Sequence, residues 1–412
     1  MSRGFLAICE LTLATAIAQA VPGAASEPPA KVDPVGLAGK VMCGYQGWFR
    51  CPGDPAKRGW LHWSRDARRL APDTLTFEMW PDLSEFPPDL LHPAPGFTHS
   101  DAKTATLFSS ADAGTVSRHF GWMKQHGIDG AYVQRFLVNL RDPSFDQVLD
   151  HCRAAAKEHG RTYAVCYDLS GMRPGRLVET LAADWKRLAL ERKLTADSHY
   201  LRDGGKPVLF VWGFFEDRFP AATAHRIIDL FKGDGPEAAT LIGGCQWHWR
   251  RARDPEWARA FRRLDVISPW NVGNVTIENG RKFAATDYWN EDLAEAKRAG
   301  ARYLPVIYPG FAWTNLKGKG SERATIPRLG GEFYWRQFVA AAERKLDMAY
   351  VAMFDEVDEG TAIFKVTNDP PKEAKFATYD GLPSDRYLRL TGEGRRLLRG
   401  ERSDNRMPGG AK

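Results

Sequence analysis

Eight short apolar runs alternate with amphipathic segments along this chain, and this alternation constrains the fold more than any other feature. The runs are rich in Val, Ile and Tyr, as strands buried on both faces are. They span residues 40–49, 128–136, 161–169, 206–213, 239–246, 265–270, 302–308 and 348–354. Segments with helical periodicity follow them, over 115–126, 145–159, 176–192, 221–232, 254–264, 290–299, 332–345 and 384–398.

Eight strands that alternate with eight helices predict a (β/α)8 barrel, an α/β fold in which parallel strands close on themselves. A doubly wound open sheet is the alternative, but no G-x-G-x-x-G motif follows any of the runs. The length of 412 residues suits one barrel with insertions. The longest connection, over 50–110, is expected to wall one side of a cleft. Its aromatic residues are Trp60, Trp63, Trp80, Phe86 and Phe97.

The two ends of the chain are predicted to lie outside the barrel. Residues 1–20 have the features of a secretory signal peptide, with Arg3 before an apolar stretch and an A-x-A cleavage site at 18–20. Residues 21–37 are Pro-rich and suggest a flexible linker, the barrel is expected over 38–400, and 401–412 are expected to be a disordered tail. These features predict a secreted or periplasmic protein, and no other run is long enough to span a bilayer.

Charge and cysteine content argue against several function classes. The net charge of +6 is spread along the chain without a dense basic block, so we expect a solvated monomer that binds no nucleic acid. Loss of Cys9 with the signal peptide leaves an odd number of cysteines, which excludes a full disulfide framework. Cys43 and Cys51 flank one turn and could form a disulfide in an oxidising compartment. No Cys/His spacing matches a zinc site, so we predict neither a metal nor a cofactor.

Four carboxylates follow the eighth run within five residues: Asp355, Glu356, Asp358 and Glu359. Glu356 and Glu359 are three apart, which on a helical turn separates their Cβ atoms by roughly 5–6 Å. Glycosidases use two carboxyl groups at about that separation or somewhat more. An extended strand would place the pair about 10 Å apart on opposite faces, so the chemistry requires a turn, which Gly360 permits. A solvated acidic loop is the alternative reading.

Polar and aromatic residues gather at the C-terminal ends of the eight runs, where a (β/α)8 barrel carries its active site. The chain also contains 14 Trp, whose ring faces suit the apolar faces of sugars, so an oligo- or polysaccharide is the expected partner. Packing at the barrel rim is the alternative for each of these residues alone. The candidates for substrate binding are Tyr45, Trp48, Asp168, Trp212, Gln246, His248, Trp270, Tyr308 and Asp355.

Several short motifs resemble those of a known enzyme group. The sequence FDEVDEG at 354–360 resembles the W-N-E-W-H-E-G motif of bacterial glycoside hydrolases of family 99 and the related family 71. The two glutamates and the glycine match, whereas the Asn, Trp and His positions differ. YPGF at 308–311 is similar to the P-G-Y/F element of family 99, and DGGKPV at 203–208 to its N-G-K-P-V. CGYQGWF at 43–49 with WLHW at 60–63 resembles a branch labelled xylosidase/arabinosidase.

The resemblance implies a retaining (β/α)8 enzyme that cleaves α-linked glycans. By motif, Glu356 would be the base on the 2-hydroxyl of the sugar, giving a 1,2-anhydro sugar, and Glu359 the acid/base. Asp168 falls where the family has a substrate-binding acid, and the family's aromatic subsite positions fall on Tyr45, Trp212 and Trp270. The altered motif leaves a carbohydrate-binding barrel without catalysis as a second hypothesis. An enzyme of the xylosidase/arabinosidase type and a carbohydrate-active lyase or transferase are further alternatives.

Overall fold

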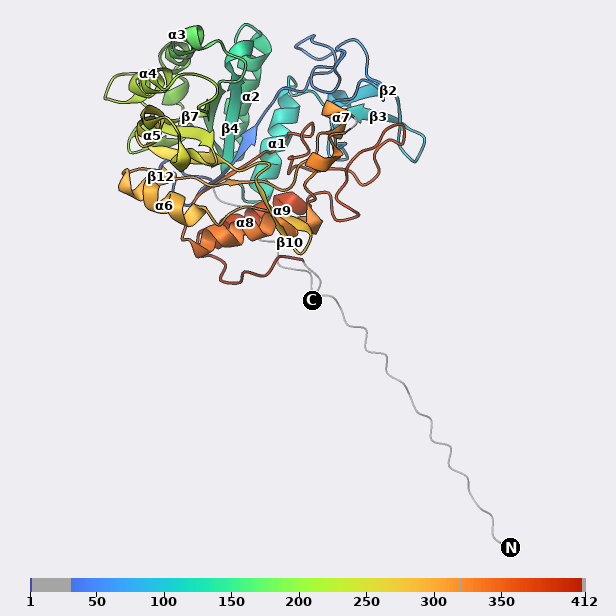
Figure 1. Ribbon diagram of the computed structural model, residues 1–412. Coiled ribbons are helices and arrows are strands. Elements are labelled where there is room, and N and C mark those ends of the chain that lie inside the picture. The colour runs from blue at the N-terminus through green and yellow to red at the C-terminus, as the bar shows by residue number, and fades with distance from the viewer. Residues whose placement is uncertain (2–30, 319, 410–412) are drawn as a thin grey trace.

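The computed structural model describes Met1, residues 31–318 and residues 320–409. Parallel strands form the centre of the molecule and helices surround them (Figure 1). The central strands are β1 (Val41–Tyr45), β4 (Gly130–Phe136), β5 (Thr162–Asp168), β7 (Lys206–Phe214), β8 (Thr240–Gln246), β9 (Val266–Trp270), β12 (Arg302–Tyr303), β13 (Val306–Ile307) and β14 (Ala349–Val351). Each of the eight predicted runs contains one or two of them.

The seventh run closes the sheet into a barrel. Its first half, β12, pairs with β9, and its second half, β13, pairs with β14. Between the halves, Leu304 N donates to Ile267 O at 2.9 Å, and Tyr350 N donates to Pro305 O at 3.0 Å. Proline lacks an N–H, so the strand is interrupted at residue 305 while its carbonyl still bonds to the next strand. The predicted (β/α)8 barrel is therefore confirmed.

All eight predicted helices are present, most within three residues of the expected ends. They are α1 (Ala113–Gln125), α2 (Pro143–His159), α3 (Pro174–Lys186), α4 (Ala221–Phe231), α5 (Pro255–Phe261), α6 (Trp289–Arg298), α8 (Glu332–Glu343) and α9 (Arg386–Leu398). Local chemistry sets several ends. Asp142 accepts from Ser144 N and Asp254 from Glu256 N, which caps α2 and α5 at their first turns. Gly160 ends α2 in a left-handed conformation.

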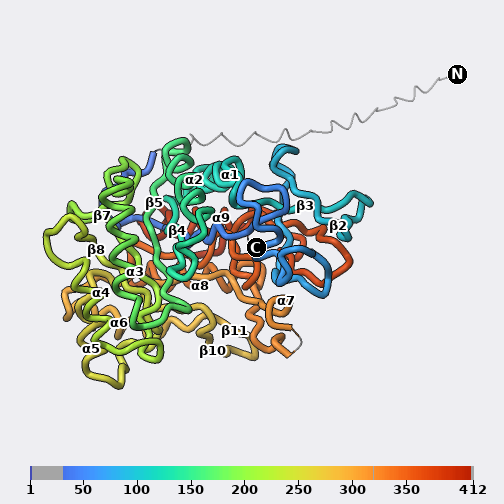
Figure 2. The backbone as a smooth tube through the Cα atoms, turned by 90° about the horizontal axis from the view of Figure 1, so that it is seen from above, coloured from blue at the N-terminus to red at the C-terminus, as the bar shows by residue number. Residues whose placement is uncertain are grey.

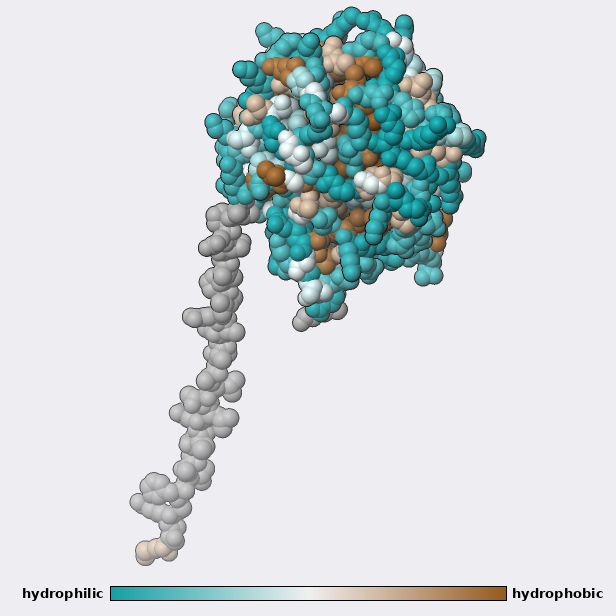
Figure 3. Space-filling model, turned by 90° about the vertical axis from the view of Figure 1, so that its left-hand side faces the viewer, coloured by the Kyte–Doolittle hydropathy of each residue, from teal (hydrophilic) through white to brown (hydrophobic). Residues whose placement is uncertain are grey.

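Shorter strands and helical turns lie outside the eight barrel strands and the eight predicted helices. They are β2 (His92–Thr98), β3 (Thr104–Leu107), β6 (Arg202–Asp203), β10 (Val275–Glu278), β11 (Arg281–Ala284), α7 (Thr314–Lys317), a π-helical turn at Arg187–Glu191, and 3-10 turns at Pro88–Leu90, Leu137–Asn139, Leu194–Ala196, Trp249–Arg251, Glu322–Ala324 and Leu329–Gly331. Two views place the β2–β3 hairpin beside the barrel, on the side of α7 and away from α3 to α6 (Figures 1 and 2). The face that carries α4 to α6 is mostly hydrophilic (Figure 3).

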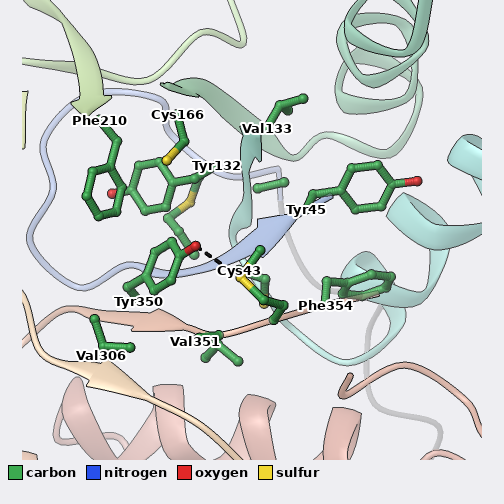
Figure 4. Packing of buried hydrophobic residues seen from close by; sticks show 14 of the residues in the cluster. Cys43, Tyr45, Tyr132, Val133, Cys166, Phe210, Val306, Tyr350, Val351 and Phe354 are labelled. Carbon is green, nitrogen blue, oxygen red and sulfur yellow. Dashed lines mark hydrogen bonds between the residues drawn. The ribbon is translucent and has the colours of Figure 1, made fainter. Parts of the chain in front are cut away.

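Large side chains fill the barrel interior beneath the C-terminal strand ends. Tyr132 stacks on Tyr350 with ring centroids 5.6 Å apart and meets Phe210 edge-on at 5.3 Å. Gln134 Nε2 donates to the Tyr350 hydroxyl at 3.0 Å. Figure 4 shows this group on one side of β1, while Tyr45 points to the other side, toward the helices. The interior is thus a packed floor and not a channel.

The long 50–110 connection has its own core. Trp63 packs on Phe49 with ring centroids 4.2 Å apart and on Phe77 at 4.9 Å, and Trp80 packs on Phe97 at 5.5 Å. Its five aromatic residues Trp60, Trp63, Trp80, Phe86 and Phe97 are all buried, so they form the core of the connection and not a surface. A connection this long orders itself by burying its own aromatic rings.

The chain packs against the barrel just after residue 31 and again near residue 409. Val32 is buried and its N–H donates to Gly160 O at 2.9 Å, so the predicted linker is ordered from that point. Trp335 Nε1 donates to Asn405 O at 2.7 Å, and Arg386 Nη1 donates to Pro408 O at 2.6 Å. The tail is therefore not disordered over 401–409. Residues 2–30 lie outside the described part, so the signal peptide and export remain predictions.

The five cysteines after residue 30 are buried free thiols. Cys43 lies on β1 within the barrel wall, whereas Cys51 Sγ donates to Phe108 O at 3.2 Å inside the core of the long connection. The two thiols are free, so a Cys43–Cys51 disulfide is absent. No helix within the described ranges is both long and apolar enough to cross a membrane.

Two glycines provide a matched test of the packing of α9 against α8. A Cβ on Gly394 would lie 2.5 Å from the Phe338 ring, whereas a Cβ on Gly175 of α3 would have no atom within 4 Å. Gly394→Ala should lower the free energy of unfolding by about 1–3 kcal/mol through overpacking. Gly175→Ala should raise it by about 0.4–1 kcal/mol, since alanine reduces the freedom of the unfolded chain. Urea denaturation measures both, and equal stability of the two variants would contradict the α8–α9 contact.

Candidate active site

The chain turns directly after β14, and this turn brings the two glutamates together. Glu356 O accepts from Thr361 N at 3.1 Å and from Ala362 N at 3.0 Å, which closes the segment into a compact turn. Gly360 adopts φ +61°, the left-handed conformation that the sequence predicted it would permit. Glu356 and Glu359 therefore lie on one turn and not on an extended strand.

A cavity of about 280 Å³ lies at the C-terminal ends of the strands. Small-molecule sites commonly run from about 300 to 1,000 Å³, so this cavity suits a small unit such as one sugar ring. Its walls come from residues at or just after the ends of β1, β4, β5, β7, β9 and β14. The lining residues are Gln46, Trp48, Gln134, Phe136, Asp168, Ser170, Trp212, Trp270, Met353, Glu356 and Glu359.

Glu356 is the deeper of the two glutamates and is held at both carboxylate oxygens. Oε1 accepts from Gln46 Nε2 at 2.6 Å, and Oε2 accepts from Thr361 Oγ1 at 2.7 Å. Burial, followed by repulsion from Glu359 and Asp358, raises the pKa of Glu356 well above its usual range, while the two donors oppose this shift. The two hydrogen bonds fix the orientation of the carboxylate and favour its charged form.

Glu359 lies nearer the surface on the same turn. Burial, with a smaller contribution from the charge of Asp358, raises its pKa to about 7, and Lys317 partly opposes this shift. Two neighbouring carboxyl groups in a poorly solvated site cannot both ionise freely. The pair can therefore share one proton near neutral pH, which provides one acid and one base.

Asp355 is fully buried behind the pair and does not reach the cavity. Oδ1 accepts from Gln46 N at 2.8 Å and Oδ2 from Gly47 N at 2.9 Å, while burial raises its pKa to about 7. Asp355 thus ties the end of β1 to the turn after β14. Its predicted substrate contact is not supported, because both oxygens face backbone amides.

Tryptophan rings form two walls of the cavity. Trp212 and Trp270 meet nearly perpendicular at 5.4 Å, and Trp48 stacks between Phe136 at 5.1 Å and His62 at 4.0 Å. His62 is the point at which the long connection reaches the site, and its Nδ1 lies 3.8 Å from Asp358 Oδ2.

Three polar atoms in the cavity wall have no hydrogen-bond partner among the described residues: Gln46 Oε1, Trp48 Nε1 and Trp212 Nε1. Asp168 also lines the cavity. Its Oδ1 accepts from Ser170 N at 2.7 Å, and burial raises its pKa. Buried polar atoms are normally hydrogen-bonded, so these atoms suit a ligand that both donates and accepts hydrogen bonds.

Six of the predicted site residues line the cavity: Trp48, Asp168, Trp212, Trp270, Glu356 and Glu359. Asp355 and four other predicted site residues do not line the cavity. Tyr45 is fully buried on the helix side of β1, where its hydroxyl contacts His119 Nδ1 at 3.0 Å. The hydroxyl of Tyr308, also buried, donates to Asn274 O at 3.3 Å.

The last two predicted contacts, Gln246 and His248, lie at the end of β8 and on the loop after it. Gln246 Oε1 accepts from Glu216 N at 3.2 Å, and His248 is exposed on the following loop. Neither residue lines the cavity. The strand ends at residue 246, so the residues beyond it follow the loop away from the barrel axis.

Five lining residues were not among the predicted ones: Gln46, Gln134, Phe136, Ser170 and Met353. Residues two apart on a strand share a face, so Gln134 and Phe136 could have been inferred together from the end of β4. Gln46 lies beyond the end of β1, so no strand period predicts its direction. Glu78 of the long connection also has its pKa raised to about 7 by burial, although it accepts a hydrogen bond from Asn315 N. The sequence carries no signal for Glu78.

Within residues 31–318 and 320–409, no group of three or more His, Cys, Asp and Glu side chains is arranged to hold a metal ion.

Neither a protein-family model nor a curated protein matches the sequence. Solved structures do match the fold. Two structures of the glycoside hydrolase family 99 endo-α-mannosidase from Bacteroides thetaiotaomicron, one in complex with bis-tris-propane, each have a TM-score of 0.66, cover 89% of this chain and 100% of their own, and are 18% and 17% identical to it. A glycoside hydrolase-like protein has a TM-score of 0.54, 13% identity, and coverage of 89% and 96%. At these identities the likeness establishes a shared fold.

The raised pKa of Glu359 predicts a pH dependence of stability. Its carboxyl titrates near 7 in the folded chain and near 4.3 in the unfolded chain, so it favours folding fully only below about pH 4. This contribution is lost as the pH rises through 7. Glu359→Gln should therefore lose less stability than wild type between pH 5 and pH 8, measured as urea midpoints. Glu343→Gln, at the exposed end of α8, should follow wild type, and equal slopes for all three proteins would contradict the assignment.

Proposed function

We propose that this chain is a retaining glycoside hydrolase that cleaves α-linked glycans, with Glu356 and Glu359 as the reacting pair. The observation that carries this proposal is the turn after β14, which presents two buried glutamates to a tryptophan-walled cavity at the C-terminal end of a (β/α)8 barrel. The shared fold with a family 99 endo-α-mannosidase supports it.

The first step displaces the leaving group. The Glu356 carboxylate accepts the proton of the sugar 2-hydroxyl while O2 attacks C1, the bond from C1 to the leaving oxygen breaks, and Glu359 donates its proton to that oxygen. A 1,2-anhydro sugar results. Glu356 takes the base role by its place in the motif, and its two donors orient the carboxyl group while opposing the burial that raises its pKa. The Glu359 carboxyl group accepts no hydrogen bond from the described residues and has a pKa of about 7, so it suits the acid role.

The second step returns both residues to their starting states. Glu359, now a carboxylate, removes a proton from water, the water oxygen attacks C1, and the bond from C1 to O2 breaks. O2 recovers its proton from Glu356. Each step inverts C1, so the overall configuration is retained.

The cavity walls provide the contacts that orient the ring. The indole faces of Trp212 and Trp270 can cover the apolar face of a sugar, while Trp48 Nε1 and Trp212 Nε1 can donate to hydroxyl oxygens. Gln46 Oε1 and the Asp168 carboxylate can accept from hydroxyls. These groups are held on strand ends, which position them more precisely than mobile loops would.

Replacement of either glutamate tests the proposal directly. Glu356→Gln and Glu359→Gln should each lower kcat by about 10²–10⁴-fold, since each variant loses general acid–base catalysis. Activity is measured on aryl α-glycosides and on α-mannan, α-glucan, xylan and arabinan fragments. Circular dichroism should be unchanged, and Glu343→Gln should retain full activity. Undiminished turnover in both site variants would refute the proposed roles.

The acid role of Glu359 predicts an alkaline limit to activity. As the pH rises through about 7, Glu359 loses the proton that it must donate, so kcat/KM should fall above that pH. A dinitrophenyl glycoside needs no proton on its leaving group. Its single-turnover release by Glu359→Gln should therefore be fast and independent of pH between 6 and 9. A decrease in this rate at alkaline pH in the Glu359→Gln variant would show that a group other than Glu359 causes the alkaline loss of activity.

A carbohydrate-binding barrel without catalysis is the second candidate. It is favoured by Val357 and Asp358, which stand where family 99 has Trp and His, and by the protein donors that already engage both oxygens of Glu356. Calorimetric titration with the same glycans separates the two candidates: binding with no hydrolysis of any panel member supports the binding module.

A further inference from the structure

We propose that the glycan bound here is anionic, and that a basic groove beside the cavity binds its sulfate or carboxylate groups; this inference rests on the proposed glycosidase function. The basic groove consists of two adjoining hollows of about 780 and 330 Å³. The larger lies between the long connection and the start of α2, and the smaller lies between the ends of β4 and β5. They share Val138 and Arg141.

Five cationic side chains line the basic groove: Lys57, Arg58, Arg141, Arg173 and Arg176. The one acid among its lining residues, Asp142, lies 3.1 Å from Arg58 Nε and caps α2 through Ser144 N. The opposing charge is therefore already engaged, and the groove retains a net positive charge.

Four of these cations have side chains with no ion pair or hydrogen bond to any described residue: Lys57, Arg141, Arg173 and Arg176. Arginines elsewhere on the chain are extensively paired, as Arg250 is with Glu291 and Asp292 and as Arg302 is with Asp203. Unpaired arginines gathered in one concavity favour binding of an external anion. The planar guanidinium also matches a sulfate or carboxylate with two parallel hydrogen bonds.

The basic groove adjoins the cavity, because residues that are neighbours in the chain line the two. Phe136 lines the cavity and Val138, two residues later, lines the groove; Ser170 lines the cavity and Gly171 lines the groove. On the other side, His62 lines the larger hollow and stacks on Trp48 of the cavity wall. One polysaccharide chain can thus contact both.

The cavity and the basic groove carry charges of opposite sign. The cavity contains Glu356, Glu359 and Asp168, with Asp355 and Asp358 buried behind them. Repulsion from these carboxylates disfavours an anion on the ring at the cleavage position. The anionic groups therefore belong to the neighbouring sugars, over Arg141 and Arg173. Val138, 48% exposed between the two hollows, offers an apolar contact to a ring there.

Matched polysaccharide pairs test this inference by calorimetry with the full-length protein. Dextran sulfate is compared with dextran, and polygalacturonate with its methyl ester, because each pair shares an α-linked backbone. The anionic member should bind at least tenfold more tightly in one pair or both, and its affinity should fall with added salt. Arg141→Gln/Arg173→Gln should weaken that binding at least tenfold.

The control variant removes the same charge elsewhere. Lys124→Gln/Lys157→Gln lies in the last turns of α1 and α2, about 20 Å along α2 from the groove, and should bind within twofold of wild type. Equal binding of both members of both pairs would overturn the proposal. So would an equal loss in the control variant, or equally tight binding of a single-stranded DNA oligonucleotide of matched charge.

The outcomes also separate this inference from the proposed activity. Hydrolysis of neutral glycans without any preference for anionic ones would support the glycosidase activity and contradict the binding of anionic glycans in the groove. Binding of an anionic glycan that depends on the groove, without hydrolysis, would support the anion-binding role of the groove and contradict the glycosidase activity.

Discussion

The buried carboxylate of Asp355 joins the first and last strands of the barrel, and the geometry of the site depends on that contact. Its two oxygens accept from Gln46 N and Gly47 N. These bonds place the Gln46 side chain where its amide reaches Glu356 Oε1. The same residue thus supports closure of the barrel at its C-terminal rim and the orientation of the proposed base. A motif acid that seemed suited to substrate contact instead acts as a positioning residue.

The site concentrates carboxyl groups that would be more stable in water. Asp355, Glu359 and Glu78 all have their pKa raised to about 7, with burial as the largest cause. Such groups reduce folding stability at any pH at which they must ionise, so packing of the surrounding core has to offset this loss. The compensation is visible nearby, in the packed ring pairs of the barrel floor and in the aromatic core of the long connection. A site that holds a proton at neutral pH is obtained at this cost in stability.

Much of the fold was accessible from the sequence because its signals are local. Apolar runs of strand length, helical periodicity and Gly stops depend on neighbours within a few residues, and all eight strands and eight helices were predicted. The burial of the aromatic residues of the 50–110 connection does not follow from the sequence, because an exposed wall and a buried core require the same residue types. The composition of 401–412 predicts a disordered tail, whereas Trp335 and Arg386 bind carbonyls of residues 405 and 408. Contacts of that kind join residues far apart in the sequence.

The sequence by itself determined the (β/α)8 order and the pair Glu356 and Glu359, since both follow from spacing along one segment. Only the tertiary structure decided which strand-end residues face the cavity. Tyr45 and Gln46 are adjacent, yet one packs on His119 outside the barrel and the other bonds to Glu356 inside it. The basic groove is likewise tertiary, because Lys57, Arg141 and Arg173 come from three loops that barrel closure brings together. Local patterns specify elements, whereas the direction of each side chain depends on strand register and closure, which are set by long-range packing.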